Sequence, residues 1–81
     1  MLIEAPEVEA ELYGQPIVDV RFRGNRRVES EAMLLEITSG PGKRVDARTL
    51  AADLRRLWEL GYFDDVSVEG ELGKGGVVLT F

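Results

Sequence analysis

The chain has 81 residues, no cysteine, no histidine and a formal net charge of −5. A chain of this length folds as a single domain. The absence of cysteine excludes disulfides and thiolate metal sites, and the absence of histidine removes the commonest general base and metal ligand. The acidic balance disfavours non-specific nucleic-acid binding. We therefore expect a protein that is not an enzyme, needs no cofactor and binds no nucleic acid.

The first 16 residues form an acidic arm. Its sequence, MLIEAPEVEAELYGQP, is interrupted by Pro6, Gly14 and Pro16. This composition is typical of a linker or a loosely attached extension, with at most a short strand near Val8–Leu12. We expect the folded domain to span residues 17–81.

A strand is predicted where the arm ends. In IVDVRF, at 17–22, apolar and polar side chains alternate, which is typical of a half-buried strand. Val18, Val20 and Phe22 are expected to face the core. The Gly-Asn pair that follows ends the strand because both residues tolerate positive φ.

A short helix is predicted next, over 28–37. Ser30 is its expected N-cap, because a serine hydroxyl can accept a hydrogen bond from an amide of the first turn. Met33, Leu34 and Ile37 form its expected apolar stripe. The SGPG sequence after it ends the helix.

The clearest element is a longer helix over 45–61. Its leucines recur at helical spacing and therefore share one face (Leu50, Leu54, Leu57). Asp46 is the expected N-cap. Gly61 is the expected C′ residue, where glycine tolerates the left-handed conformation that ends many helices.

Two further strands are predicted, at 65–69 and 77–81. The glycine-rich segment GELGKGG, at 70–76, is expected to be the loop that joins them into a hairpin. The element order is thus β-α-α-β-β. In such an α+β domain, the two helices bury their apolar stripes on one face of a three-stranded sheet.

Several motifs occur in a fixed order along 17–81. They are F-x-G-N at 22–25, GKRV at 42–45, a long helix running into GYFDDV at 61–66, and V-x-L-x-F at 77–81. In this order they resemble the POTRA (polypeptide-transport-associated) domain of outer-membrane β-barrel assembly proteins. The GYFDDV junction is the most specific of them, since a helix stop alone does not require its residue order.

The resemblance implies a fold and a role. The fold is a three-stranded mixed sheet in the order first–third–second (1-3-2), covered on one face by two antiparallel helices. The role is that of a periplasmic module of an outer-membrane β-barrel assembly factor, attached to the outer membrane by a C-terminal barrel that lies outside this chain. The implied partners are unfolded outer-membrane β-barrel proteins, accessory assembly subunits and neighbouring POTRA domains.

The strand at 65–69 is the first candidate binding site, because the implied sheet order leaves it at an edge. An edge strand carries unpaired N–H and C=O groups, to which an extended peptide can add as a further strand. The alternative is that acidic side chains and strand twist protect this edge from pairing. The candidate peptide-binding residues are Asp65, Val66, Ser67, Val68 and Glu69.

The loop RGNRR, at 23–27, is the second candidate site. It could contact a neighbouring domain, a partner protein or phospholipid headgroups. The alternative is a basic surface that only meets solvent. The residues of this candidate contact loop are Arg23, Gly24, Asn25, Arg26 and Arg27.

Two other functions remain open. One is the related POTRA-type module of cell-division or two-partner-secretion proteins, which shares the fold but has other partners. The other is a KH-like nucleic-acid-binding module, because SGPGKR at 39–44 lies between two predicted helices. Its G-x-G spacing differs from the G-x-x-G of KH loops, and the acidic net charge does not suit RNA.

Overall fold

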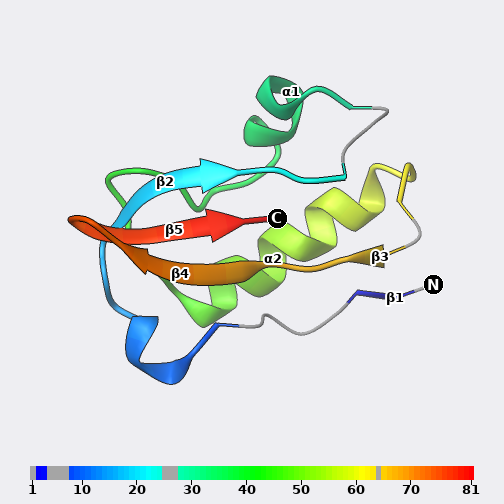
Figure 1. Cartoon of the computed structure of the whole chain (residues 1–81). Coiled ribbons are helices and arrows are strands. Elements are labelled where there is room, and N and C mark those ends of the chain that lie inside the picture. The colour runs from blue at the N-terminus through cyan, green and yellow to red at the C-terminus, as the bar shows by residue number, and fades with distance from the viewer. Residues whose placement is uncertain (1, 4–7, 25–27, 64) are drawn as a thin grey trace.

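The computed structural model describes residues 8–24, 28–63 and 65–81, together with the backbone of residues 2–3. Within these ranges the chain forms five strands, two α-helices and one 3-10 helix, η1 (Figure 1). The elements in chain order are β1 (Leu2–Ile3), η1 (Ala10–Leu12), β2 (Ile17–Arg21), α1 (Ser30–Leu34), α2 (Ala47–Glu59), β3 (Asp65–Val66), β4 (Glu69–Gly73) and β5 (Gly76–Thr80).

The main sheet has three strands in the order β2-β5-β4. Its central strand, β5, is parallel to β2 and antiparallel to β4, so the sheet is mixed as expected. The expected 1-3-2 order placed the strand at 65–69 beside the last strand, and this assignment needs correction. The strand beside β5 is β4, which begins at Glu69. Residues 65–66 form β3, which pairs with β1 in a separate two-stranded sheet.

The hairpin differs from the prediction because most of its expected loop is strand. Gly73 pairs with Gly76, and only Lys74 and Gly75 form the turn between them. Gly75 has φ +86°, a conformation that glycine adopts at little cost. Gly70, which made the segment look like a loop, lies inside β4 with the side chains of Val8 and Leu12 packed over its Cα. A strand glycine commonly marks such a close approach.

Strand β2 departs from simple alternation. Its pairing with β5 shifts register between Ile17 and Asp19, as at a β-bulge. A bulge adds one residue to a strand and so reverses which side chains face the core. Ile17 is consequently buried, whereas Val18 is 40% exposed. The prediction that Val18 faces the core is wrong for this reason.

Helix α2 forms as its sequence predicts. The Asp46 carboxylate accepts a hydrogen bond from the Thr49 backbone N–H at 2.9 Å, which confirms the N-cap. Gly61 has φ +82° immediately after the helix. The three leucines of the predicted face are at most 1% exposed (Leu50, Leu54, Leu57).

Helix α1 is shorter than predicted, and its N-cap is Glu29 rather than Ser30, which is the first helical residue. Met33 is buried as expected, but Leu34 is 42% exposed. After the helix, the Glu36 N–H donates to the Met33 carbonyl at 3.0 Å in a tighter turn, and the backbone N–H of Thr38 donates to the Asp53 carboxylate of α2 at 2.8 Å.

The core lies between the main sheet and α2, which runs behind β4 in Figure 1. The fold is therefore α+β, with a three-stranded mixed sheet and two helices, while the antiparallel packing of the helices stays a prediction. None of the helices that the structure describes is long and apolar enough to cross a membrane. The buried apolar residues are Leu12, Ile17, Met33, Ile37, Val45, Leu50, Leu54, Leu57, Val66, Val68, Val77 and Leu79.

The second half of the acidic arm is attached to this core. Leu12 is only 6% exposed. The Gly14 N–H donates to the Val45 carbonyl at 2.8 Å, and the Val45 N–H donates to the Gln15 carbonyl at 2.9 Å. The expected strand near Val8–Leu12 is wrong, because residues 10–12 form η1. The division of the chain at residue 16 stays a prediction.

Candidate peptide-binding edge

The predicted edge, 65–69, belongs to two strands. Asp65 and Val66 form β3, Ser67 and Val68 connect the strands, and Glu69 begins β4. The side chains alternate along this path as the sequence indicates: Val66 and Val68 are buried, while Asp65 and Glu69 are exposed. The acids therefore face solvent, and the valines anchor the strand to the core.

Strand β1 pairs with one side of β3. Leu2 is in register with Asp65 and Ile3 with Val66, and the two strands are parallel. Figure 1 shows β1 alongside β3. The outer side of β3 is thus able to pair with an extended segment, and a segment of the same chain is paired with it in this structure.

The order β2-β5-β4 leaves two edge strands in the main sheet, β2 and β4, of which β4 follows β3 in the chain. Among the strands that the structure describes, β4 has β5 as its only partner. The sequence assigned only Glu69 of this strand to the candidate edge, because the glycines at 70 and 73 were read as loop residues. The backbone available for strand addition therefore extends past Glu69 along β4.

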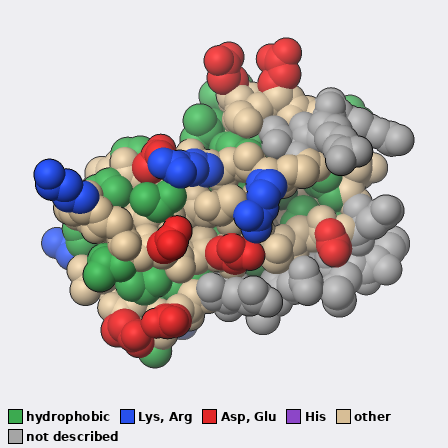
Figure 2. Space-filling model, viewed as in Figure 1, with side chains coloured by type: hydrophobic (Ala, Val, Ile, Leu, Met, Phe, Trp, Pro, Cys, Tyr) green, Lys and Arg blue, Asp and Glu red, His purple; other side chains and the backbone are tan. Residues whose placement is uncertain are grey.

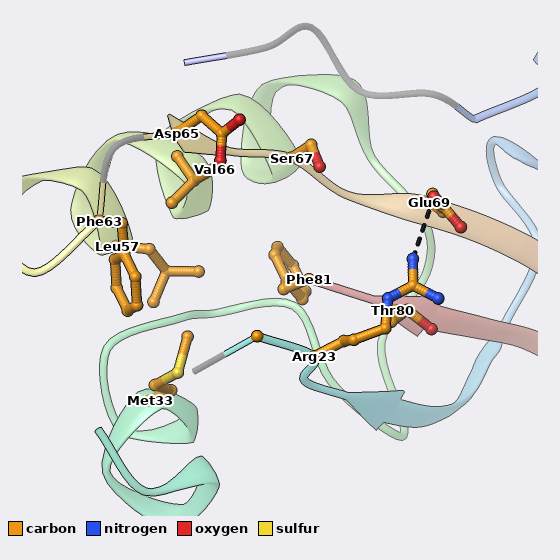
Figure 3. Close-up of a pocket in the computed structure, with 11 residues that line it drawn as sticks. Arg23, Met33, Leu57, Phe63, Asp65, Val66, Ser67, Glu69, Thr80 and Phe81 are labelled. Carbon is orange, nitrogen blue, oxygen red and sulfur yellow. Dashed lines mark hydrogen bonds and ion pairs between the residues drawn. The ribbon is translucent and has the colours of Figure 1, made fainter. Parts of the chain in front are cut away.

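A cavity of about 170 Å³ lies beside β3 at one end of the main sheet (Figure 3). Its apolar walls come from α1, α2, the loop after α2, β3 and the residue after β5, whereas polar and charged groups form the rest of its lining. Helix α2 contributes Leu57 and α1 contributes Met33. The apolar lining residues are Met33, Leu57, Phe63, Val66 and Phe81, and the polar ones are Arg23, Asp65, Ser67, Glu69 and Thr80.

The two candidate sites meet at this cavity. The Arg23 guanidinium Nη2 lies 3.3 Å from Glu69 Oε1, as the dashed line in Figure 3 marks. Gly24, with φ +78°, also lines the cavity. The other three residues of the predicted contact loop, Asn25, Arg26 and Arg27, lie outside the described residues, so their role stays a prediction.

Charges of both signs are interspersed on the face of the molecule seen in Figure 2. Arg21 Nε lies 3.1 Å from Asp19 Oδ2 on β2, and Arg23 pairs with Glu69. Both arginines of the basic stretch that the structure describes therefore have an acidic partner. In the described part of the chain no group of three acidic side chains is placed to hold a metal ion.

An acidic pair lies at η1, which packs against β4. The Glu9 side chain shares a hydrogen bond with Glu11, and this bond together with charge repulsion raises the pKa of Glu9. A backbone hydrogen bond, followed by the same side-chain bond, lowers the pKa of Glu11. At neutral pH the pair adds negative charge beside β4.

Sequence reasoning missed the residues that complete this site. The sequence places Leu2 and Ile3 in a loose arm, because two adjacent apolar residues are too few to show the alternation that indicates a strand. From the sequence, Phe63 and Phe81 are only members of the motifs GYFDDV and V-x-L-x-F, yet both line the cavity. Their meeting depends on the three-dimensional path of the chain, and no local motif indicates it.

The geometry defines a class of protein: a small α+β module with an exposed strand edge and a neighbouring cavity. A family model described as "POTRA: Surface antigen variable number repeat" matches residues 16–81. Since the match covers most of the chain, this protein belongs to the POTRA family. The KH-like alternative receives no support from this match.

Two relatives agree with this assignment. The chain is 32% identical over 68 residues to the outer membrane protein assembly factor BamA of Nitratidesulfovibrio vulgaris, covering 84% of the chain and 9% of that protein. It also resembles the solved N-terminal domain of Omp85 from the thermophilic cyanobacterium Thermosynechococcus elongatus, with a TM-score of 0.63 and 31% identity over 88% of the chain and 34% of that structure. The chain thus spans only a small part of either relative.

Proposed function

We propose that this chain is a periplasmic protein–protein interaction module of an outer-membrane β-barrel assembly factor. It binds unfolded outer-membrane proteins or accessory assembly subunits by β-strand addition, and it catalyses no reaction. In the full-length protein it is attached to the outer membrane through a C-terminal barrel and adjoins other POTRA domains. The name of the BamA relative, an outer membrane protein assembly factor, supports this role over a cell-division or two-partner-secretion role.

The observation that carries the proposal is the pairing of β3 with β1. It shows that the backbone of Asp65 and Val66 can form a ladder with an extended segment. In strand addition the main-chain hydrogen bonds supply most of the affinity, and pockets for alternate side chains supply specificity. A site of this kind suits clients that share a strand conformation but differ in sequence.

The cavity lies on the other side of β3 from β1. Its lining includes Arg23, Met33 and Phe81. In Figure 1, β1 lies on one side of β3, whereas the C-terminal end of the chain lies on the other. A client strand that pairs in the place of β1 therefore does not enter the cavity, and the proposal depends on main-chain pairing with 65–69.

The test is an NMR titration of the labelled domain with a peptide taken from a strand of an unfolded outer-membrane protein. The expected result is a set of amide shifts confined to 65–69 and the adjoining face of α2. Two N-methylated forms of the peptide are the matched controls. One carries the methyl groups on the backbone nitrogens of its odd-numbered residues, and the other carries them on its even-numbered residues. Since only one edge of the added strand pairs with the domain, one form should lose binding and the other should keep it.

Three other results would contradict the proposal. A peptide with proline at every second position cannot donate to a ladder, so equal shifts with that peptide would indicate contact without strand addition. Shifts confined to 21–24 would assign the contact to the arginine loop instead. No shift at millimolar peptide would leave the domain without client binding.

A further inference from the structure

The proposed client site and strand β1 use the same backbone groups. β1 pairs with Asp65 and Val66, which are the first two residues of the proposed peptide-binding edge. β1 also lies close to α2, the helix that borders this edge. A client strand that approaches this edge of β3 therefore finds the backbone of Asp65 and Val66 already paired with β1.

We infer that β1 is an intramolecular competitor for the client site, and that a client strand replaces it in the same parallel orientation. This inference rests on the proposed function. β1 then acts as a removable strand: it protects the β3 edge when no client is present and leaves when a client binds, while the second half of the arm stays attached to the core. An exposed edge strand otherwise invites pairing between copies of a protein, and covering the edge is a common protection.

The short length of β1 makes it replaceable. It consists of two residues, so it forms only a few backbone hydrogen bonds with β3. The net gain from so few bonds is comparable to the entropy cost of ordering the residues that make them. The closed and open states of the edge are therefore close in free energy.

A longer client has backbone groups to use that β1 does not reach. In the register that is observed, Leu2 lies opposite Asp65 and Ile3 opposite Val66. A parallel strand that continues beyond the position of Ile3 runs past Ser67 and Val68 toward Glu69. It gains further main-chain contacts there, which lets it displace β1.

The orientation has a direct consequence. A client that takes the place of β1 has its N-terminal end beside Asp65 and its C-terminal end toward Glu69. The opposite arrangement is expected for a client that ignores the β1 position and adds in an antiparallel manner. The direction of the bound peptide is thus a second, independent readout.

The first experiment compares four forms of the protein. They are the full chain, a form that begins at Val8 and lacks β1, the double variant Leu2→Pro/Ile3→Pro, and the control Leu2→Ala/Ile3→Ala. Proline removes the backbone N–H and cannot donate to a ladder, whereas alanine keeps it. Val8 and Leu12, which pack over Gly70, are retained in every form.

Amide hydrogen exchange without any peptide reports on β1 alone. At least one amide among 65–67 should exchange faster in the truncated and proline forms than in the full chain and the alanine control. Peptide titration then reports on competition. Binding should be tighter by about three- to ten-fold in the truncated and proline forms, because a larger fraction of the protein has an open edge.

The outcomes separate the two proposals. Equal affinity in all four forms, with shifts at 65–69, would overturn the competition and leave the proposed function intact. Weaker binding without β1 would also overturn it, since β1 would then support the site. If no form binds any peptide, the proposed function fails and the inference fails with it.

The second experiment places a spin label at either end of the peptide. A label on the N-terminal end should broaden the Asp65 amide most, and a label on the C-terminal end should broaden the Glu69 amide most. The reverse pattern would overturn the parallel orientation.

Discussion

The Asp53 carboxylate on α2 accepts two hydrogen bonds from Thr38, one from its backbone N–H at 2.8 Å and one from its hydroxyl at 3.0 Å. A third comes from the backbone N–H of Ser39 at 2.9 Å. Asp53 is completely buried. One side chain thus fixes the chain after α1 to the helix that borders the candidate site.

Replacing Asp53 should destabilise the domain strongly. In Asp53→Ala the donors of Thr38 and Ser39 lose their acceptor, and buried donors without partners are costly. We expect the free energy of unfolding to fall by about 2–4 kcal/mol. Urea denaturation followed by circular dichroism measures the change. Glu59→Ala, at an exposed position of the same helix, is the control and should differ from the parent by less than about 0.5 kcal/mol.

The N-cap of α2 should make stability depend on pH. The hydrogen bond from the Thr49 backbone N–H lowers the pKa of Asp46 below its ordinary value of 3.8. The folded state therefore favours the charged carboxylate. This contribution is fully present above the unfolded-state pKa and is lost as the pH falls through the lower folded-state pKa.

Thermal unfolding of the parent and of Asp46→Asn checks this effect. The asparagine side chain can still cap the helix but does not titrate in this range. The difference in Tm between the two proteins should be constant at neutral pH and should shrink as the pH drops from about 5 to about 2. A Tm difference that stays constant down to the lowest pH would show that titration of Asp46 does not affect the stability of the fold.

Gly76 should tolerate no side chain. A Cβ at this position would clash with the carbonyl oxygen of Pro16 and lie 2.8 Å from Val18 Cγ1. Relief is difficult because the Pro16 carbonyl also accepts the Val77 N–H at 2.8 Å. Gly76→Ala should lower stability by about 2 kcal/mol or more. Gly40→Ala is the matched control, since no heavy atom lies within 4 Å of a Cβ there.

The ion pair at the cavity should matter little for stability. Its side chains are 72% exposed at Arg23 and 52% exposed at Glu69, and exposed pairs contribute about 0–1 kcal/mol. Glu69→Gln should therefore unfold within about 1 kcal/mol of the parent. Raising the salt concentration should remove even this difference. A larger loss that persists in high salt would show that Glu69 has a structural role beyond the ion pair.

The parts of the fold that local signals specify were predicted well. The Asp46 cap, the leucine face and Gly61 all lie within one 16-residue stretch and act on the same helix. The alternation of Val66 and Val68 likewise places both side chains in the core. Each of these features depends on neighbours in the sequence, so the pattern alone was sufficient.

The errors come from contacts between distant segments. Gly70 lies in a strand that pairs with β5, and the side chains of Val8 and Leu12 leave little room for a Cβ there; no pattern around Gly70 indicates either contact. β1 likewise forms only because Ile3 pairs with Val66, a pairing across most of the chain. The candidate edge was therefore located by resemblance, whereas the pairing of β1 with this edge is seen only in the structure.

The position of β5 in the main sheet has a consequence for the formation of the sheet. β2 and β4 both use β5 as their strand partner in the sheet, and β5 begins at Gly76. A chain that ends before Gly76 therefore lacks the strand on which both outer strands pair, and it cannot form this sheet even though α2 is complete. Integrity of the last strand is thus a condition for the whole sheet, and not only for its C-terminal end.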